Sequence, residues 1–416
     1  MSEFPRAIVA LRHRNFRLFW TGQLVSLTGS WMQGVAQSWL VLSLTNSPVW
    51  LGLASAAATL PILAFTLAGG VVADLFDKRK TLVVAQSLLM LQAALLAYLT
   101  LSHGAKLWHI MSLAAMLGTI SAFEIPTRQS FAVELVGKED LQNAISINSM
   151  VFNITRILGP SAGGVVIAAF GAGGCFALNA VSFLAVLVAL LMMRGPFPAP
   201  PRKSTPASHQ MREGLAYVIH HPRMRGLVLH VAAISIFGMP YVTLMPIIAR
   251  DVLHGGPRML GFLQASAGVG ALLAAMWIAS QGATRPRFES RSRVIWLGSF
   301  SVSLLLIALS RSQTAWISAT IIALIGASVV TAVVNTNTLL QTLVPDELRG
   351  RVMSVHVITF IGLAPISALL AGTLAHLVGA PHALLIHGSL TLLFSGAFGY
   401  WVVPWRPSSH PVDCAA

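Results

Sequence analysis

The sequence predicts an all-α integral membrane protein with twelve transmembrane helices arranged as two six-helix bundles. Of its 416 residues, 55% are hydrophobic and 10% are charged, whereas soluble proteins carry about 25% charged residues. Apolar runs of about 20 residues, the length that crosses a hydrocarbon core, recur along nearly the whole chain. The second half also repeats short patterns of the first half. The composition therefore excludes a water-soluble protein.

Each apolar run is expected to form a helix, because a helix satisfies its own backbone hydrogen bonds in lipid. The first run is too long for the core of a signal peptide, and no convincing small-residue cleavage site follows it, so we expect a retained helix. The twelve spans are predicted at residues 16-43, 48-74, 80-102, 107-125, 143-169, 173-194, 223-250, 258-280, 293-311, 314-340, 352-376 and 382-404.

The basic residues predict the orientation of these spans. Most of the 27 lysines and arginines fall in segments that would share one face of the membrane. Because positively charged loops stay in the cytoplasm, we predict a multi-pass protein of the cell inner membrane with both termini cytoplasmic. The net charge of +14 then reflects membrane orientation, and no nucleic-acid partner is expected.

Two pairs of segments indicate a duplicated six-helix unit. LGLASAAATLPIL begins at Leu51 and LGFLQASAGVGALL at Leu260, a shift of 209 residues. LVGKEDLQNAIS begins at Leu135 and LVPDELRGRVMS at Leu343, a shift of 208 residues. Chance similarity between apolar stretches is the alternative interpretation.

The duplication predicts three parts of the chain. Residues 1-194 are expected to form the N-terminal bundle, and residues 223-416 the C-terminal bundle with a short tail. Residues 195-222 begin with a segment rich in proline and serine, which cannot form a packed or lipid-facing element. We predict a cytoplasmic linker there that ends in a short, basic, surface-lying helix.

The fifth span contains NITRILGPSAGG, with one arginine in an apolar setting. An arginine near the bilayer centre costs about 2.5 to 3.5 kcal/mol on insertion scales, so Arg156 should face water or a partner. Pro160 should bend the helix, while Gly159, Gly163 and Gly164 let a neighbouring helix approach closely. This would suit the contact between two moving bundles, and a simple packing face is the alternative.

Arg156 shares one helical face with Ser149 and Phe152. We predict that Phe152 and Arg156 line a substrate cavity, where Arg156 binds an anionic or polar group of the substrate or modulates a coupling carboxylate. The alternative is a structural arginine that donates hydrogen bonds to carbonyls of a broken helix.

The loop between the second and third spans reads GGVVADLFDKRKTL. Asp74 would lie at the cytoplasmic end of the second helix, where its carboxylate can pair with basic groups and hold an inner gate shut. Residues 78-80, which include Lys78 and Arg79, would also anchor the loop at an anionic leaflet. An ordinary positively charged loop is the alternative.

These features resemble the major facilitator transporters, whose two parallel six-helix repeats are joined by a cytoplasmic linker. The loop resembles the family pattern G-x-x-x-D-R-x-G-R-K at Gly70, Asp74, Lys78 and Arg79, but Leu75 and Asp77 depart from it. The GPSAGG stretch is similar to the G-P-x-x-G-G motif of exporters and antiporters. With AFEIPTRQSFAVELV and CFALNAVSFL, it resembles the branch that contains the enterobactin exporter and macrolide efflux pumps. The fourth span lacks the arginine of the antiporters' R-x-x-x-G motif.

Two polar stripes are further candidates for the substrate cavity. In the family the first helix lines the central cavity, and polar side chains on a membrane helix need water or protein on their side. Hydrogen bonding between helices is the alternative for every member. The predicted cavity residues are Gln23, Ser26, Ser30, Gln33 and Gln37 on the first span and Asn335 on the tenth.

The expected energy source is a proton gradient. The chain has no G-x-x-x-x-G-K-[ST] loop for nucleotide hydrolysis, so we predict a secondary transporter that works by rocker-switch alternating access. Glu124, with Arg128 one turn on, is the first coupling candidate, and His230 is another titratable group in a span. No cofactor and no metal site are expected; the partners would be a small-molecule substrate, protons and the lipid bilayer, and the protein is expected to be a monomer.

The predicted function is efflux of a small amphipathic molecule, such as a drug or a siderophore. Uptake by the same fold, or a membrane sensor without transport, are the alternatives. An integral-membrane enzyme would need acid–base or metal groups converging at one depth. His220 and His221 are the clustered pair, and they lie in a basic surface segment, so an enzyme is not predicted.

Overall fold

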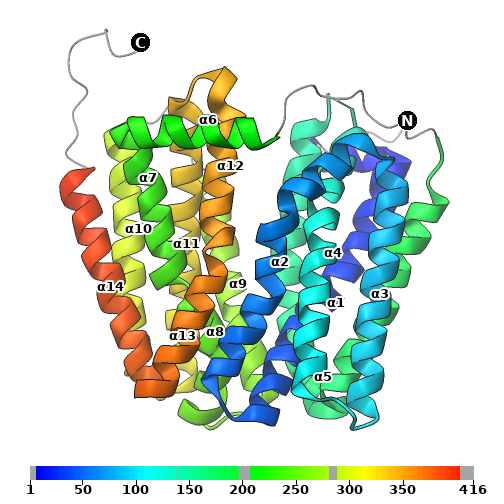
Figure 1. Ribbon diagram of the computed structural model, residues 1–416, viewed down its shortest axis with the longest axis horizontal. Helices are drawn as coiled ribbons and strands as arrows, with labels where there is room; N and C mark the ends of the chain where they lie inside the picture. Colours follow the sequence, from blue (N-terminus) through cyan, green and yellow to red (C-terminus); the bar gives the residue numbers. More distant parts are fainter. Residues whose placement is uncertain (1–5, 138, 196–206, 281–287, 403–416) are drawn as a thin grey trace.

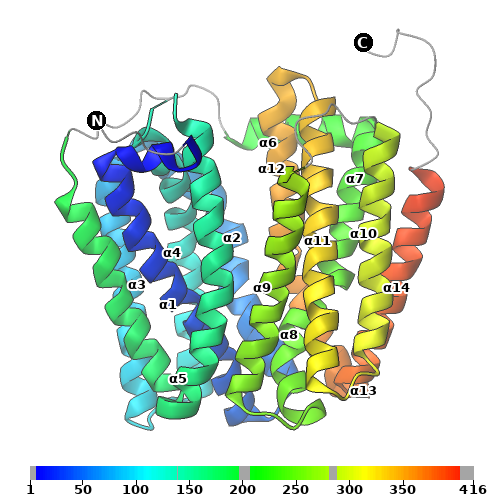
Figure 2. The same ribbon diagram turned by 180° about the vertical axis from the view of Figure 1, so that it is seen from behind.

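The computed structural model describes residues 6–137, 139–195, 207–280 and 288–402, and every regular element in these ranges is a helix (Figures 1 and 2). The prediction of an all-α protein is confirmed. The first bundle contains a short 3-10 helix and five α-helices: η1 (Arg6–Arg12), α1 (Arg14–Thr45), α2 (Pro48–Leu75), α3 (Lys78–Leu101), α4 (Leu107–Glu134) and α5 (Leu141–Met192).

The second bundle follows the surface helix α6 (Ala207–His220), which lies across one end of the molecule (Figure 1). The first span of this bundle, which is the seventh of the chain, consists of four consecutive helical pieces, two of them π-helical: α7 (Pro222–Ala233), η2 (Ile234–Gly238), α8 (Pro240–Ile247) and η3 (Ile248–Val252). The remaining helices are α9 (Pro257–Ser280), α10 (Phe288–Leu309), α11 (Ala315–Leu343), α12 (Asp346–Gly362), α13 (Ala364–Val378) and α14 (Ala380–Trp401).

Ten helical stretches in the described ranges are long and apolar enough to cross a membrane. One of them, α5, supplies two spans that meet at Gly171, where a φ of 71° breaks the helix. A side chain would strain this left-handed conformation, which glycine adopts freely. The polar helix α1 is the remaining span, and the predicted twelve-helix fold is confirmed. The division of the chain into domains stays a prediction.

Two of the predicted spans differ from the helices of the structure. The fourth span was predicted to end at 125, but α4 continues through Pro126 to Glu134. A proline one residue past a predicted end favours termination, yet packing of Phe131 in the core of the first bundle keeps this helix going. The eleventh span is divided at Leu363 into α12 and α13, and Pro365 lies in the first turn of α13.

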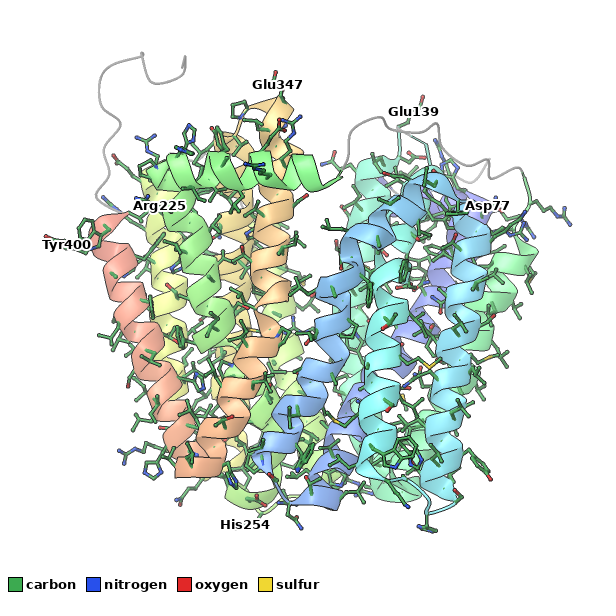
Figure 3. The ribbon with its side chains drawn as sticks, viewed as in Figure 1. Asp77, Glu139, Arg225, His254, Glu347 and Tyr400 are labelled. Carbon is green, nitrogen blue, oxygen red and sulfur yellow. The ribbon has the colours of Figure 1, made fainter. Side chains whose placement is uncertain are left out.

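The molecule has two unlike ends, which we name the α6 end and the far end. The start of α1, the end of α14 and helix α6 lie at the α6 end, and the connections at Asn46, Gly171 and Gly379 lie at the far end (Figures 1 and 2). Figure 3 places the charged residues Asp77, Arg225 and Glu347 at the α6 end and His254 at the far end. The charged ends thus flank the apolar middle.

The apolar cores show where the bundles join. Toward the far end one continuous core includes residues of both bundles, among them Leu42, Leu51 and Ile167 with Tyr241, Leu260 and Ala371. Toward the α6 end there are two separate cores. One consists of first-bundle residues such as Phe19, Leu82 and Phe131, and the other of second-bundle residues such as Leu227, Ile295 and Leu340. The bundles are therefore packed together at the far end.

Candidate functional site

The two bundles cross at glycines near the far end. A Cβ placed on Gly164 of α5 would lie 2.7 Å from the carbonyl oxygen of Pro257, at the start of α9. A Cβ on Gly261 of α9 would lie 2.4 Å from the Pro160 carbonyl oxygen. Real Cβ atoms essentially never come closer than 3.0 Å, so only glycine allows these two backbones to touch. Small residues have this role at close helix crossings in membranes.

A second crossing joins α2 to α13 in the same way. A Cβ on Gly52 would lie 2.4 Å from the Ala368 carbonyl oxygen, and one on Gly372 would lie 2.6 Å from the Pro48 carbonyl oxygen. Gly52 and Gly261 occupy the same position in the repeated LG segments, 209 residues apart, and Gly164 and Gly372 are 208 residues apart. The two crossings are thus equivalent in the two halves, as a duplicated unit requires.

The glycines of the fifth span have two different neighbours. A Cβ on Gly159 would lie 2.3 Å from the Trp31 Cβ, and one on Gly163 would lie 3.2 Å from the Met32 Cα, so both glycines pack against α1 inside the first bundle. Gly164 and the Pro160 carbonyl instead contact α9 of the second bundle. The motif therefore fixes α5 between its own bundle and the other one.

Arg156 lies beside this crossing, one turn before Pro160. Its carbonyl oxygen would stand 3.1 Å from a Cβ on Gly268 of α9. Its partly buried guanidinium is close enough to Tyr241 of α8 for an electrostatic interaction between the bundles. Within the described ranges Arg156 has no hydrogen-bond or ion-pair partner. Phe152, 45% exposed, lies one turn away and makes an edge contact with Trp31, with ring centroids 5.7 Å apart.

Arg250 joins the bundles at the far end, and the sequence reasoning missed it. Its Nη1 donates to Asn46 Oδ1 at 2.7 Å and to the Leu42 carbonyl oxygen at 3.3 Å, both at the end of α1. The adjacent Asp251 carboxylate accepts from Arg250 Nε at 2.6 Å and Nη2 at 3.2 Å. The guanidinium therefore bridges the two bundles while its charge is balanced locally.

The predicted polar stripe of α1 lies largely inside the first bundle. Gln33 is 2% exposed; its Nε2 donates to Gln92 Oε1 of α3 at 3.1 Å, and Asn179 Nδ2 of α5 donates to its Oε1 at 2.7 Å. Gln23 and Ser26 are each 3% exposed. We call Gln33, Gln92 and Asn179 the amide network. Its interhelical hydrogen bonds match the alternative considered for this stripe.

The other two members of the stripe are more accessible. Ser30 is exposed and donates to the Ser26 carbonyl oxygen at 3.0 Å, and Gln37 is partly buried. On α11, Asn335 is 7% exposed and its Nδ2 donates to the Thr331 carbonyl oxygen of its own helix at 2.8 Å. None of these three side chains is placed beside Arg156 by a described contact.

The coupling candidates Glu124 and Arg128 are brought together in α4. Arg128 Nε donates to Glu124 Oε1 at 2.8 Å, and Gln86 Nε2 of α3 donates to the same oxygen at 3.2 Å. Both charged side chains are at most 13% exposed. The sequence reasoning missed Gln86. The pair is a buried ion pair of the first bundle, at a depth where carboxylates are costly unless paired.

His230, the third coupling candidate, is isolated in the second bundle. It is 4% exposed and stacks on Phe398 with ring centroids 4.0 Å apart. Neither of its ring nitrogens has a hydrogen-bond partner among the described residues.

The predicted gating loop lies at the α6 end. Lys78 is buried and pairs with Glu134 at the end of α4, and Arg79 donates to the carbonyl oxygens of Leu190 and Leu191 at 2.7 and 3.0 Å. Asp74 has no hydrogen bond or ion pair with any described residue. Gly70 faces open space, since a Cβ there would meet no atom within 4 Å.

The packing glycine of this region is the neighbouring Gly69. A Cβ on Gly69 would lie 2.0 Å from the Ala122 carbonyl oxygen of α4. The sequence pattern identified the glycine pair, but which of the two faces a helix depends on the rotation of α2.

Comparisons with known proteins agree with this architecture. Residues 6–408 match the model of a family described as transmembrane secretion effector. The chain is 26% identical to the staphyloferrin A transporter of Staphylococcus aureus, covering 92% of this chain and 95% of that protein. It is 26% identical to the multidrug efflux pump Tap of Mycolicibacterium fortuitum (94% and 96% covered) and 24% identical to the enterobactin exporter of Shigella flexneri (82% and 80% covered).

A solved structure shows the same fold at low identity. The nucleoside transporter NupG superposes with a TM-score of 0.74 at 10% identity, covering 95% of this chain and 100% of that chain. The resemblance inferred from the sequence motifs is confirmed, and the matched family and its members are transporters, not enzymes. The chain belongs to the transmembrane secretion effector family of major facilitator transporters.

Proposed function

We propose that the protein is a secondary active exporter of a small amphipathic molecule, driven by proton entry across the cell inner membrane. The relatives that carry siderophores or drugs support this substrate class. The basic segments at the α6 end support an orientation with both termini and α6 in the cytoplasm. In this orientation the packed far end faces outward.

The observation that carries the proposal is the position of Arg156. A guanidinium without a hydrogen-bonding partner in a membrane span is expensive, so its presence where the bundles meet has to serve binding. Arg156 binds an anionic or polar group of the cargo, and Trp31 and Phe152 provide apolar contact beside it. Tyr241, buried in the far-end core, holds the second bundle close to Arg156.

Export follows by rocking the bundles about the glycine crossings. Cargo enters from the α6 end, the loop at Asp74 closes behind it, and the far end opens when Arg250 releases Asn46. Protonation of Glu124 would weaken its ion pair with Arg128 and free the first bundle to move, so proton entry and cargo exit alternate.

The test is flux into proteoliposomes with an imposed pH gradient, using enterobactin and a macrolide antibiotic as probes. Wild type should move at least one probe against its concentration gradient, and collapse of the pH gradient should stop it. Arg156→Ala should lose at least tenfold in flux while reaching the membrane, whereas Arg293→Ala, an exposed arginine of α10, should be unaffected.

The alternatives give different results in this assay. Flux in the opposite direction would establish uptake, and no gradient-dependent flux of a broad panel would leave a sensor. Wild-type flux by Arg156→Ala would show that Arg156 is a scaffold residue, which removes the main support for the proposal.

A further inference from the structure

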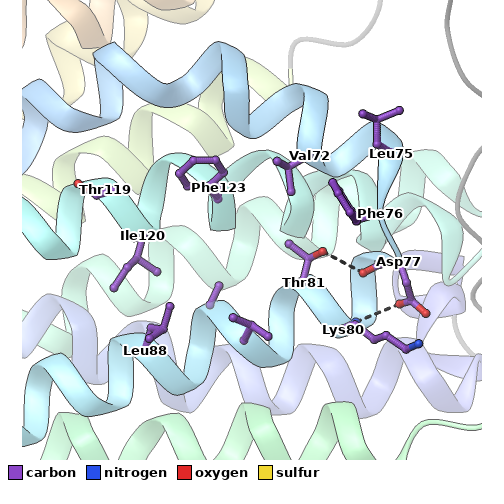
Figure 4. A pocket seen from close by; sticks show the side chains of 12 residues that line it. Val72, Leu75, Phe76, Asp77, Lys80, Thr81, Leu88, Thr119, Ile120 and Phe123 are labelled. Carbon is purple, nitrogen blue, oxygen red and sulfur yellow. Dashed lines mark hydrogen bonds between the residues drawn. The ribbon is translucent and has the colours of Figure 1, made fainter.

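A groove on the outside of the first bundle has neither Arg156 nor Glu124 among its lining residues. It encloses about 730 Å³ between α2, α3 and α4, a size within the range of about 300 to 1,000 Å³ that holds small ligands. Figure 4 shows its two ends: Asp77 and Lys80 lie at one, and Leu88, Thr119 and Ile120 lie at the other. The groove thus has a charged mouth and an apolar interior.

The groove exists because the last turns of α2, after Gly69, diverge from α4. The two helices are in backbone contact at Gly69 and at Gly118, where a Cβ would lie 2.1 Å from the Ala58 carbonyl oxygen. Beyond Gly69, α2 runs on to Leu75, and the chain reaches α3 through Phe76 and Asp77. The end of α2 is therefore held beside α3, and the space between the three helices stays unfilled.

The walls of the groove are apolar and exposed. Val84 is 60% exposed, Phe76 58% and Leu88 39%, and all three lie on a surface that would face lipid in a membrane. The hydroxyl of Thr119 donates to the Ala115 carbonyl oxygen of its own helix at 2.9 Å. The interior therefore presents little unsatisfied hydrogen-bonding capacity, and it suits a hydrocarbon chain.

The positive charge at the mouth that has no partner is that of Lys80. Its two neighbours are engaged, since Lys78 pairs with Glu134 and Arg79 donates to carbonyls at the end of α5. The Asp77 carboxylate accepts the backbone N–H of Lys80 at 3.0 Å and caps α3. The ammonium of Lys80 has no partner among the described residues, and Asp74, one residue before the end of α2, is not among the residues that line the groove.

We infer that this groove binds one anionic phospholipid, with an acyl chain between α2, α3 and α4 and its phosphate on the Lys80 ammonium. The charge complementarity and the continuity of the groove with the lipid-facing surface select this occupant. The site is separate from Arg156 and requires no transport to be observed.

The test is lipid binding to the full-length protein in detergent, measured by native mass spectrometry with dioleoylphosphatidylglycerol and dioleoylphosphatidylcholine. Wild type should bind the phosphatidylglycerol about fivefold more tightly, the effect of one basic residue near an anionic group. Lys80→Gln keeps the backbone N–H that Asp77 caps, and it should remove this preference. Thr119→Trp, which fills the apolar end, should reduce the occupancy of both lipids.

Arg293→Gln on α10 is the matched control, because Arg293 is an exposed cation near the start of the corresponding helix of the second bundle. It should leave the preference unchanged. Equal binding of the two lipids by wild type would overturn the inference. So would a preference that survives in Lys80→Gln or that disappears in Arg293→Gln.

Discussion

The two bundles share their contact surfaces but differ in their interiors. Both use a glycine pair at equivalent positions to cross the other bundle. Inside the first bundle, Gln33, Gln92 and Asn179 bond across three helices, and Glu124 pairs with Arg128. Inside the second bundle, hydroxyls bond largely within their own helices, as Ser303 does to the Ser299 carbonyl oxygen. Both copies of the duplicated unit have the glycine crossings, whereas the amide network and the buried ion pair of Glu124 with Arg128 lie in the first copy.

Because of this difference, substitutions of the crossing glycines and substitutions of interior polar residues should affect stability differently. Crossing residues should give the same result in both halves, because their surroundings are equivalent. Interior polar residues should have a larger effect on stability in the first bundle, because there amide side chains of three helices bond in a network. In the second bundle the described hydrogen bonds between helices include the isolated pair of Ser299 and Ser395.

The largest effect is expected at the crossings. Gly164→Ala and Gly372→Ala each place a Cβ within 2.7 Å of a backbone oxygen, and overpacking of this kind costs about 1 to 3 kcal/mol. Both variants should lower the thermal unfolding temperature in detergent by similar amounts and should slow transport. The measurement is a pair of melting curves with matched flux assays.

Gly396→Ala is the control for these variants. A Cβ there meets no atom within 4 Å, so the gain in helix propensity of up to about 1 kcal/mol should leave this variant as stable as wild type or more so. If Gly164→Ala and Gly372→Ala behaved like Gly396→Ala, the crossings would be no tighter than an ordinary lipid-facing surface.

An intermediate effect is expected in the amide network. Gln33→Leu leaves the Asn179 donor and the Gln92 acceptor unpaired in a buried position, which costs about 1 to 3 kcal/mol. In the second bundle, Ser303→Ala removes a hydroxyl that bonds its own helix and leaves no side chain unpaired, so the cost should be under about 1 kcal/mol. Unfolding of both variants in the same detergent measures the difference, and equal losses would contradict the contrast between the two interiors.

Much of the fold could be predicted from the sequence because hydropathy and glycine patterns act locally. The twelve spans and the glycines of the fifth span follow from residues near each other in the chain. The partner of Gly164 does not, because Gly261 is nearly a hundred residues away and the repeat only suggests that it has a similar role. The burial of Gln33 could not be predicted from the sequence pattern either. A polar stripe on a membrane helix needs polar neighbours, but the pattern does not distinguish water in a cavity from amide side chains of other helices.

Arg250 illustrates the same limit. Positive residues outside the predicted cytoplasmic segments carry little information about orientation, and nothing in the sequence marks Asn46 as the acceptor. The left-handed backbone of Asn46, with φ 49°, ends α1 and turns its side chain toward η3. Only the packed far end reveals that this arginine joins the bundles.

The smallest effect on stability is expected at the α6 end, where the two halves differ in their ion pairs. Asp140, just before α5, accepts from His13 Nε2 at 2.7 Å and pairs with Arg12 Nη2 at 2.9 Å, which ties the start of the chain to α5. Near the related position of the second half, Asp346 at the start of α12 pairs with Arg349 of the same helix. The ion pair at the start of α5 therefore joins two distant segments of the chain, whereas Asp346 pairs within α12 and the tertiary ion pair of that helix is made by Arg351 with Glu213 of α6.

The hydrogen bond to His13 holds the pKa of Asp140 below its usual range; burial opposes this shift, and the charge of Arg12 adds to it. A carboxyl whose pKa is lowered by folding stabilises the fold above the unfolded value of about 4, and that contribution is lost as the pH falls through the folded pKa. Asp140→Asn should therefore unfold at a lower temperature than wild type at pH 7, and the gap should close as the pH falls below about 4. Glu139→Gln, an exposed neighbour, should match wild type throughout. A gap for Asp140→Asn that stayed constant down to pH 3 would mean that the contact stabilises the protein through shape and not through charge.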